Sequence, residues 1–581
     1  MKFSYDMNVM VPMQDGTNLS TDIFAPADGE PRPVLLIRTA YGKHHSELGW
    51  DSTWGLSNPK FYAVLEAGYS LVVQGVRGTF DSEGVFQPFL NEAEDAADAV
   101  RWITEQPWSN GKVATAGLSY LGIDQWQGAS SGVPGLVAIA PSFGPGDIYN
   151  GVWYSTGGAM WGGAATWATG NAMIQMQRKL ALGEADPADI EEFGALLADP
   201  LALASATPMA HKPVVSKYLP WFDDVMAHAD RDDFWTQQSS IDRAEKITTP
   251  AFTILGWYDA FLRGGLEMYK AVQERGGSEE ARSGQRLIIG PWAHDSSGFG
   301  SVDPDRDFGP TASLGATQIT DQQLAFFDYW LKDDKNALDR YSPVQLFVMG
   351  INEWRGEESW PLPDTQYVEY HLHGNGLANT ADGDGVLDPS TAAETLGTDT
   401  FLYDPRRPVP TLGAPLLGAL AARDQSPVEV RDDVLCYTTP VLDTAIEVTG
   451  PISLTLFVSS SAVDTDFTAK LVDVQADGKA IPVSEGILRM RYRKSLARPE
   501  LMNPAEVYEV TIDVGATSNV FLAGHRIRLE VSSSNFPNYN RNSNTGGHIS
   551  TERLEDMVSA LNSVHHGPDF PSRLVLPVIE R

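Results

Sequence analysis

The first 145 residues alternate between short apolar runs and amphipathic stretches. Residues 33–39 (PVLLIRT) and 69–75 (YSLVVQG) are apolar and rich in β-branched residues, which is typical of strands buried on both faces of a parallel sheet. Residues 91–106 (NEAEDAADAVRWITEQ) place apolar side chains on one face at helical spacing. Strands that alternate with helices predict an α/β sheet with crossover connections.

This alternation stops at about residue 146, and few strand signals occur up to residue 245. Asp186-Pro187 is a typical helix start within that stretch, because aspartate caps a helix and proline is tolerated in its first turn. Strand-like apolar runs then reappear at residues 251–259, 286–294 and 344–350. We therefore predict a helical segment, residues 146–245, inserted into an α/β domain that consists of residues 1–145 and 246–355.

Beyond about residue 356, apolar and polar residues alternate with a period of two. In ISLTLFVSS, every second residue from Ile452 to Val458 is apolar. In HRIRLEVSS, the charged Arg526, Arg528 and Glu530 alternate with apolar residues, so we expect these charges on a solvent face. The pattern predicts antiparallel sheets that pack as a sandwich or jelly roll over residues 356–581.

Composition narrows the partners that the protein can have. The formal net charge is -34 and the sequence pI is about 4.6, which argues against binding to nucleic acid or to anionic membranes. The sequence has no run of about 18 apolar residues, and its first residues lack the apolar core of a signal peptide, so we expect a cytoplasmic protein. The single cysteine, Cys436, is interpreted as a small buried hydrophobe rather than a nucleophile.

Residues 111–130 (GKVATAGLSYLGIDQWQGAS) place Ser119 where an apolar run stops at a glycine and a helical stretch begins. A sharp strand-to-helix turn strains the residue at the bend and exposes its side chain, and small neighbours allow strand and helix to approach. The strict G-x-S-x-G pattern requires glycine at position 121, whereas this chain has Leu121 followed by Gly122. Gly-x-Ser occurs by chance in many loops, but the flanking strand and helix favour a nucleophile. Tyr120 would begin the helix and direct its backbone N–H at a developing oxyanion.

The partners of a nucleophilic serine on this scaffold follow in the order serine, acid, histidine, at the ends of later strands. Of the eleven histidines, His294 alone follows a strand assigned to the α/β sheet, and the preceding strand ends in Asp259. We interpret His294 as the general base and Asp259 as the residue that fixes the imidazole tautomer. The alternatives are a structural loop histidine and a helix cap, respectively. No metal or nucleotide motif occurs, so no cofactor is expected.

The motifs around these three residues, GLSYLG, GWYD and GPWAH, resemble those of the cocaine esterase and X-prolyl dipeptidyl peptidase family of serine hydrolases. The likeness extends over essentially the whole chain and includes four longer strings, at residues 346–355, 360–365, 459–474 and 532–547. The resemblance implies an α/β-hydrolase fold with an inserted helical cap and a C-terminal jelly roll, in agreement with the three regions predicted from the pattern.

The resemblance also implies an oxyanion hole and an acyl pocket. The hole would consist of the Tyr41 hydroxyl and the Tyr120 N–H, although the residues alone would suggest that Tyr41 is a packed aromatic. The substrate-binding positions that the family pattern indicates are Trp153, Trp167, Phe261, Leu416, Leu417 and Trp54. In the Leu416-Leu417 loop, a leucine stands where the cocaine esterase branch of the family has phenylalanine. Trp54 stands where that branch has a glutamine. These departures leave open whether cocaine is a substrate.

The leading hypothesis is a serine carboxylesterase for small-molecule esters with an aromatic or bulky apolar acyl group. The alternative is an X-prolyl dipeptidyl peptidase, α-amino-acid ester hydrolase or acylase, which would need carboxylates to bind an amino group. Five aspartates in the predicted insertion could supply them, although a solvated acidic face is the simpler explanation: Asp223, Asp224, Asp230, Asp232 and Asp233. A binding module with an inactive triad is a third hypothesis. Relatives can dimerise, so a homodimer is a further expectation.

Overall fold

The structure is a computed structural model of the 581-residue chain. It describes residues 2–43, 61–198, 205–210, 213–294, 302–303, 305–390, 396–413 and 422–581.

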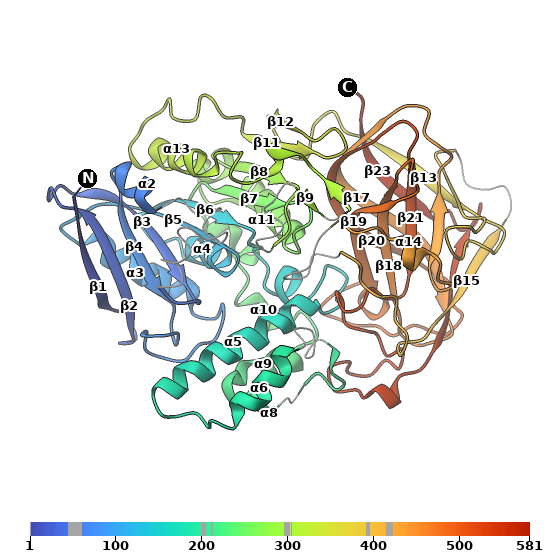
Figure 1. The fold of residues 1–581 in the computed structure, drawn as a ribbon, viewed down its shortest axis with the longest axis horizontal. Coiled ribbons are helices and arrows are strands. Elements are labelled where there is room, and N and C mark those ends of the chain that lie inside the picture. The colour runs from blue at the N-terminus through green and yellow to red at the C-terminus, as the bar shows by residue number, and fades with distance from the viewer. Residues whose placement is uncertain are drawn as a thin grey trace.

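A ten-stranded sheet organises the N-terminal part of the described chain, from Phe3 to Glu357 (Figure 1). Across the sheet its strands are β1 (Phe3–Pro12), β2 (Asn18–Pro26), β4 (Ser70–Gly75), β3 (Arg32–Thr39), β5 (Ser109–Leu118), β6 (Leu136–Ser142), β7 (Phe252–Gly256), β8 (Arg286–Gly290), β11 (Val344–Val348) and β12 (Glu353–Glu357). From β4 to β11 neighbouring strands run parallel, and the edge strands pair antiparallel. Every residue of β4 is buried, as predicted for a strand covered on both faces.

Helices cover this sheet through apolar faces. They are α2 (Phe61–Glu66), α3 (Glu92–Thr104), α4 (Tyr120–Ser130), α11 (Leu262–Arg275), α12 (Glu279–Ser283) and α13 (Ile319–Leu331). Helix α3 buries Ala96, Val100 and Ile103, and its first turn is acidic, which complements the positive end of the helix dipole. No helix in the described ranges is both long and apolar enough to cross a membrane.

The cap segment lies between β6 and β7 and is helical, as predicted (Figure 1, teal). Its elements are η2 (Tyr149–Trp153), α5 (Gly162–Ala181), α6 (Asp189–Ala198), α8 (Pro213–Tyr218), α9 (Pro220–Ala227), α10 (Asp233–Thr236) and η3 (Ile241–Lys246). The helix expected to start at Asp186-Pro187 begins at Asp189 instead. The Asp186 carboxylate accepts a hydrogen bond from the backbone N–H of Ala188 at 2.9 Å, and so it caps a turn that precedes the helix.

The C-terminal part is built from strands that form a second sheet, the β-domain (Figure 1, orange and red). They are β13 (Gln366–His373), β14 (Val386–Asp388), β15 (Gly397–Tyr403), β16 (Leu435–Thr438), β17 (Ile446–Ser460), β18 (Asp466–Val474), β19 (Ala480–Arg489), β20 (Tyr508–Phe521), β21 (Arg526–Ser532), β22 (Ala560–His566) and β23 (Arg573–Ile579). Pairing is antiparallel except between β14 and β16. The short elements are β9 (Val302–Asp303), β10 (Arg306–Asp307), α14 (Ser426–Glu429), η5 (Pro310–Ala312), η6 (Met490–Tyr492) and η7 (Leu554–Asp556).

One detail of the predicted β-domain is wrong. Arg528 and Glu530 do not face solvent, because they are only 8% and 4% exposed. The Arg528 guanidinium pairs with the Glu429 carboxylate, and Glu530 lies 4.0 Å from the Lys470 ammonium group. The period-two pattern therefore predicted the strand correctly, but it did not show that both faces of β21 are covered.

The first sheet ends slightly later than the predicted limit at residue 355. Strand β12 extends to Glu357 and still pairs with β11, whereas β13, which begins at Gln366, belongs to the second sheet. The change from one sheet to the other therefore falls between these two residues, and the limits of the three predicted domains stay predictions.

Candidate active site

Ser119 occupies the turn between the central strand β5 and helix α4. Its φ is 64° and its ψ is -121°, a conformation that L-residues adopt only under strain and that is concentrated at functional sites. The backbone N–H of Ser119 donates to Ser142 O at 2.9 Å, and its carbonyl accepts from the N–H groups of Gly122 and Ile123. These bonds hold the turn to the end of β6 and to the first turn of α4.

The glycines on either side explain why the variant spacing is tolerated. A Cβ at Gly117 would lie 2.3 Å from the Leu121 Cβ, and a Cβ at Gly122 would lie 2.5 Å from Ser142 O. The close approach between α4 and the backbone of β6 therefore occurs at position 122 and not at 121. Leu121 is accommodated because residue 117 has no side chain.

The structure brings Ser119, His294 and Asp259 together. His294 Nε2 lies 2.8 Å from Ser119 Oγ, and His294 Nδ1 lies 2.7 Å from Asp259 Oδ2. Asp259 follows β7 and His294 follows β8, so both side chains come from the carboxyl ends of neighbouring parallel strands. All three residues are buried: Ser119 is 7% exposed, His294 2% and Asp259 4%.

This geometry determines which nitrogen of the imidazole carries the proton. A carboxylate only accepts hydrogen bonds, so His294 Nδ1–H donates to Asp259 Oδ2 and Nε2 is left to accept the Ser119 proton. The other oxygen of Asp259 accepts from the backbone N–H of Phe261 at 2.5 Å. This bond forms a turn just before α11, whose N-cap is Phe261 and has no side-chain cap, so Asp259 does not cap that helix. Separate oxygens of Asp259 hold the turn and the histidine.

Tyr41 and Tyr120 lie beside the serine. The indole N–H of Trp167 donates to the Tyr41 hydroxyl oxygen at 3.0 Å, a contact that does not use the phenolic proton. Burial raises the pKa of Tyr41 to about 12, against the opposing effect of hydrogen bonds to Trp167 and Ser119. The phenol therefore stays protonated at neutral pH. Tyr120 is the first residue of α4, where a backbone N–H has no acceptor within the helix.

A small cavity of about 20 Å³ opens above the Ser119 hydroxyl. Its walls are mainly apolar and come from several elements: Tyr41, Phe89, Ser119, Tyr120, Ile123, Val152, Trp161, Ala164, Trp167, Phe261 and His294. Trp167 and Phe261, two of the predicted substrate-binding residues, line it, and the Phe261 ring meets the His294 ring edge-on at 4.6 Å.

One predicted substrate-binding residue lies behind this wall, and its role stays a prediction. Trp153 does not line the cavity but lies behind it, 1% exposed, with its ring edge-on to Trp167 at 6.0 Å and to Trp221 at 5.8 Å. Trp153 therefore supports Trp167 from behind. The remaining substrate-binding predictions, Trp54, Leu416 and Leu417, lie outside the described residues.

Two family models match the chain. Residues 15–296 match the X-Pro dipeptidyl-peptidase (S15 family) model, and residues 336–575 match the X-Pro dipeptidyl-peptidase C-terminal non-catalytic domain. The chain is 46% identical over 588 residues to cocaine esterase from Rhodococcus sp. (strain MB1 Bresler), a match that covers 100% of this chain and 99% of that protein. The chain belongs to the S15 family of serine hydrolases. The resemblance inferred from the motifs is thus confirmed.

Two solved structures share the fold over essentially the full length of the chain. An aminopeptidase from the marine sediment archaeon Thaumarchaeota archaeon is 25% identical, with a TM-score of 0.81 and coverage of 100% of this chain and 97% of that one. An α-amino acid ester hydrolase is 25% identical, with a TM-score of 0.79 and coverage of 99% and 97%. This S15 protein is therefore a serine hydrolase with an α/β-hydrolase sheet and a β-rich C-terminal domain.

The aspartates considered as an amino-group site are not among the cavity-lining residues of this S15 hydrolase. Asp230 accepts a hydrogen bond from the Tyr492 hydroxyl at 2.8 Å. Asp232 pairs with His228 at 2.6 Å and caps α10 through the Phe234 N–H. In the described part of the chain, the cavity wall contains no carboxylate side chain.

Sequence reasoning missed two aromatic residues of the cavity, Phe89 and Trp161. Phe89 precedes α3 in a loop, and Trp161 is the residue before α5. Neither belongs to a periodic run, so no pattern in the sequence indicates that they meet the serine. Trp161 is held by a hydrogen bond from its indole N–H to Asn538 Oδ1, at 3.1 Å, which comes from the β-domain.

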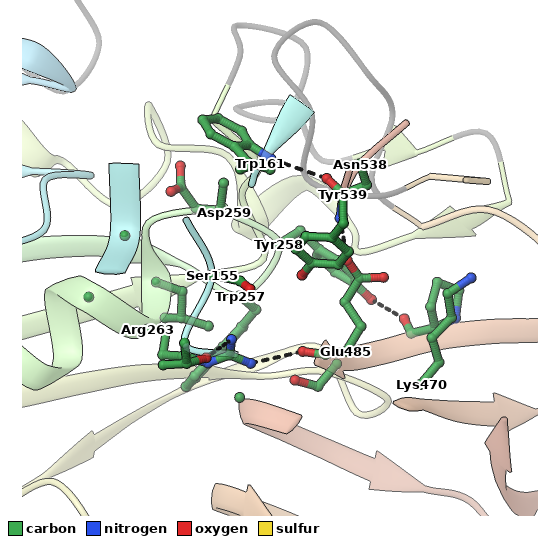
Figure 2. Close-up of a pocket in the computed structure, with 18 of the residues that line it drawn as sticks. Ser155, Trp161, Trp257, Tyr258, Asp259, Arg263, Lys470, Glu485, Asn538 and Tyr539 are labelled. Atoms are coloured by element: carbon green, nitrogen blue, oxygen red, sulfur yellow. Dashed lines mark hydrogen bonds between the residues drawn. The ribbon is translucent and has the colours of Figure 1, made fainter. Parts of the chain in front are cut away.

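A second cavity, of about 110 Å³, lies where the hydrolase sheet, the cap segment and the β-domain meet (Figure 2). Arg263 of α11 crosses this junction. Its guanidinium donates to Thr156 Oγ1 at 2.6 Å, to Glu485 O at 2.9 Å and to Asp513 O at 3.1 Å. Because Arg263 lies four residues after Asp259, these bonds tie the loop of the acid to the other two parts of the molecule.

Glu267, one turn further along α11, should make stability depend on pH. Burial, reinforced by the charge of Asp513, raises the pKa of Glu267 to about 7 from its ordinary value of 4.5. Between these pH values the native protein holds a proton that the unfolded chain has released, so stability falls as the pH rises through this window. In the wild type, we expect the free energy of unfolding to fall by on the order of 1–3 kcal/mol between about pH 5 and about pH 8. Glu267→Gln should abolish this fall, because the amide does not titrate.

Urea unfolding of the two proteins at several pH values measures this difference. Glu274→Gln is the matched control, because it makes the same change on the same helix at a side chain that is 58% exposed. Parallel pH profiles for the wild type and Glu267→Gln would contradict the assignment.

Proposed function

We propose that this protein is a carboxylesterase that hydrolyses small esters with an aromatic or bulky apolar acyl group through an acyl-enzyme on Ser119. The observation that carries the proposal is the 2.8 Å contact between Ser119 Oγ and His294 Nε2 beneath a cavity lined by aromatic side chains. An alcohol becomes a competent nucleophile when a positioned base accepts its proton.

The proposed roles follow from the contacts. Ser119 Oγ attacks the ester carbonyl carbon while His294 Nε2 takes the hydroxyl proton, and Asp259 stabilises the imidazolium that forms. The Tyr41 hydroxyl and the Tyr120 N–H donate to the oxyanion. His294 then delivers the proton to the leaving alcohol, and water hydrolyses the acyl-enzyme with the same base.

The cavity is lined mainly by apolar side chains, which suits an apolar acyl group, but it is small. About 20 Å³ accommodates about one water-sized group, so a bulky acyl group requires the aromatic side chains around it to move apart. Trp167 and Trp161 are the largest of these side chains, and they come from the cap segment. Small movements of this segment would therefore govern which acyl groups enter.

A peptidase or amino-acid ester hydrolase is the second candidate, since the similar solved structures carry these names. Such an activity needs an anionic partner for the substrate's amino group. The absence of a carboxylate from the described cavity wall favours the ester with an uncharged acyl group instead.

Steady-state kinetics on three substrates separate the two candidates. We expect kcat/KM for p-nitrophenyl benzoate to exceed that for an Ala-Pro-p-nitroanilide by about 10²-fold or more, since a site without an amino-group partner gains nothing from that amine. An alanine p-nitrophenyl ester is the matched control, because it carries the amino group but keeps the ester bond. Faster turnover of the two amino-acid substrates than of the benzoate would contradict the proposal.

Two similar proteins are named as a cocaine esterase and an α-amino acid ester hydrolase, and both names indicate small ester substrates. The same class of substrate, a small-molecule ester, is therefore proposed for this chain. The homodimer and the cytoplasmic location stay predictions. Light scattering after gel filtration tests the former.

A further inference from the structure

A buried ion pair lies beneath the turn of the nucleophile. Glu92, the first residue of α3, is 3% exposed, and its Oε2 accepts a hydrogen bond from Arg38 Nη1 at 2.7 Å. Its other oxygen, Oε1, accepts from the Tyr120 hydroxyl at 2.5 Å. Burial and the adjacent carboxylate raise the pKa of Tyr120 well above its usual value, so the phenol stays the donor in this bond.

The tyrosine held by this ion pair is the residue whose backbone N–H faces the oxyanion in the proposed mechanism. Tyr120 begins α4 directly after Ser119. The position of its side chain therefore constrains the position of its N–H, because both belong to the first residue of a helix that is buried along its whole length. Charge-assisted hydrogen bonds are shorter and stronger than neutral ones, which makes Glu92 a firm anchor.

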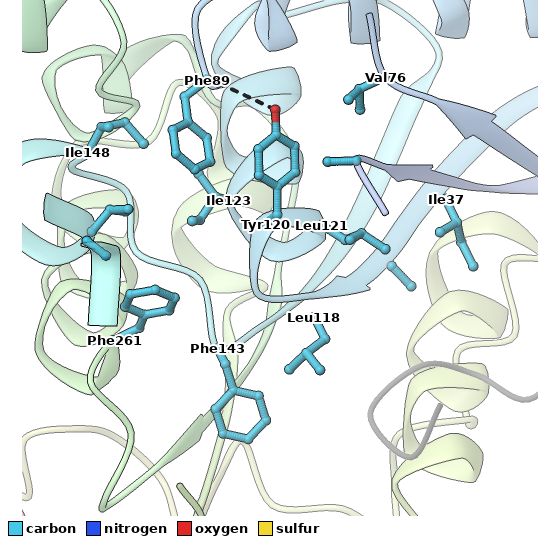
Figure 3. Packing of buried hydrophobic residues seen from close by; sticks show 14 of the residues in the cluster. Ile37, Val76, Phe89, Leu118, Tyr120, Leu121, Ile123, Phe143, Ile148 and Phe261 are labelled. Carbon is cyan, nitrogen blue, oxygen red and sulfur yellow. Dashed lines mark hydrogen bonds between the residues drawn. The ribbon is translucent and has the colours of Figure 1, made fainter. Parts of the chain in front are cut away.

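The Tyr120 ring also lies next to the second oxyanion donor. It stacks on the Phe89 ring (Figure 3), with ring centroids 4.7 Å apart, and on the Trp167 ring, with centroids 6.2 Å apart. Trp167 in turn donates its indole N–H to the Tyr41 hydroxyl at 3.0 Å, and the rings of Tyr41 and Tyr120 meet edge-on at 6.3 Å. The Tyr120 N–H and the Tyr41 hydroxyl thus both depend on the position of the Tyr120 ring. Glu92 fixes the hydroxyl of that ring.

We propose that Glu92, paired with Arg38, is a positioning residue of the oxyanion hole that acts through the Tyr120 hydroxyl. This inference rests on the proposed esterase function. Glu92 does not touch the substrate, and its effect is to hold the Tyr120 N–H and, through Trp167, the Tyr41 hydroxyl where the negative charge develops.

Tyr120→Phe tests the inference, because it removes the hydroxyl while the ring and the backbone N–H are kept. We expect kcat to fall about 10-fold with KM within about twofold, since the interaction that is weakened forms in the transition state. The affinity for an aryl boronic acid, whose adduct on serine places an oxygen in the hole, should fall by the same factor.

A second buried tyrosine provides the matched control. The Tyr437 hydroxyl donates to Asp399 Oδ2 at 2.8 Å in the β-domain, and the residue is 0% exposed against 1% for Tyr120. Tyr437→Phe should lower the melting temperature as Tyr120→Phe does, but it should leave kcat within about twofold of the wild type. The two variants therefore separate a loss of positioning from a loss of stability.

Glu92→Gln and the double variant complete a thermodynamic cycle. If Glu92 acts through Tyr120, adding Tyr120→Phe to Glu92→Gln should cause little further loss of kcat. Unchanged kcat and boronate affinity in Tyr120→Phe would overturn the inference, and so would fully additive losses in the double variant. A wild type that hydrolyses no ester and reacts with no fluorophosphonate would refute the proposed function itself, and the inference with it.

Discussion

Ser119→Ala should lower kcat for a p-nitrophenyl ester by on the order of 10⁶-fold, as expected when the nucleophile of such a triad is removed. The hydroxyl that lies 2.8 Å from His294 Nε2 is the atom that would attack the carbonyl. The protein should remain folded, because the backbone bonds of the turn, Ser119 N to Ser142 O among them, do not involve this side chain. Steady-state kinetics with a fluorescence melting curve measure both quantities.

Ser131→Ala is the control for this change. Ser131 follows the C-terminal end of the same helix, is exposed, and donates its hydroxyl to Gly128 O at 2.6 Å. Its kcat should equal that of the wild type. If Ser119→Ala retained more than about a tenth of the wild-type kcat, a residue other than Ser119 would have to be the nucleophile.

Asp259→Asn should lower kcat by about 10⁴-fold while the fold is kept. An amide at this position can donate to His294 Nδ1, which would place the ring proton on Nε2. The imidazole could then no longer accept the Ser119 proton across the 2.8 Å contact. The measurement is kcat corrected by titration of active sites, so that unfolded protein does not count as slow enzyme.

Another buried aspartate–histidine pair among the described residues serves as the control. Asp473 Oδ1 lies 2.7 Å from His525 Nδ1 in the β-domain, and its side chain is 2% exposed. Asp473→Asn should cost stability and leave kcat nearly unchanged. A loss of less than about 10-fold in Asp259→Asn would mean that the carboxylate does not govern the tautomer of His294.

The three clustered residues were predictable because parallel sheets bring strand ends together. Asp259 and His294 follow two apolar runs that are consecutive in the sequence, and these runs became the neighbouring strands β7 and β8. The position of Ser119 was indicated in the same way by a strand that stops at a glycine. Chain order and strand ends thus sufficed to place side chains that are up to 175 residues apart.

The wall of the cavity was not predictable from the residues alone. Phe89 and Trp161 come from segments without periodicity, and their contacts depend on how the cap segment sits on the sheet. Trp153 was expected in the wall because it matches a family position, but it lies one layer behind Trp167. Period-two alternation likewise could not show that the charges of β21 meet Glu429 and Lys470.

The most direct test of the account is the identity of the residue that becomes covalently modified. The protein is reacted with a fluorophosphonate, or quenched in acid during turnover of an aryl ester, and its peptides are mapped by mass spectrometry. We expect one adduct per chain, on Ser119, in the peptide that contains the turn between β5 and α4. An adduct on another residue, or full turnover with no adduct on Ser119, would contradict it.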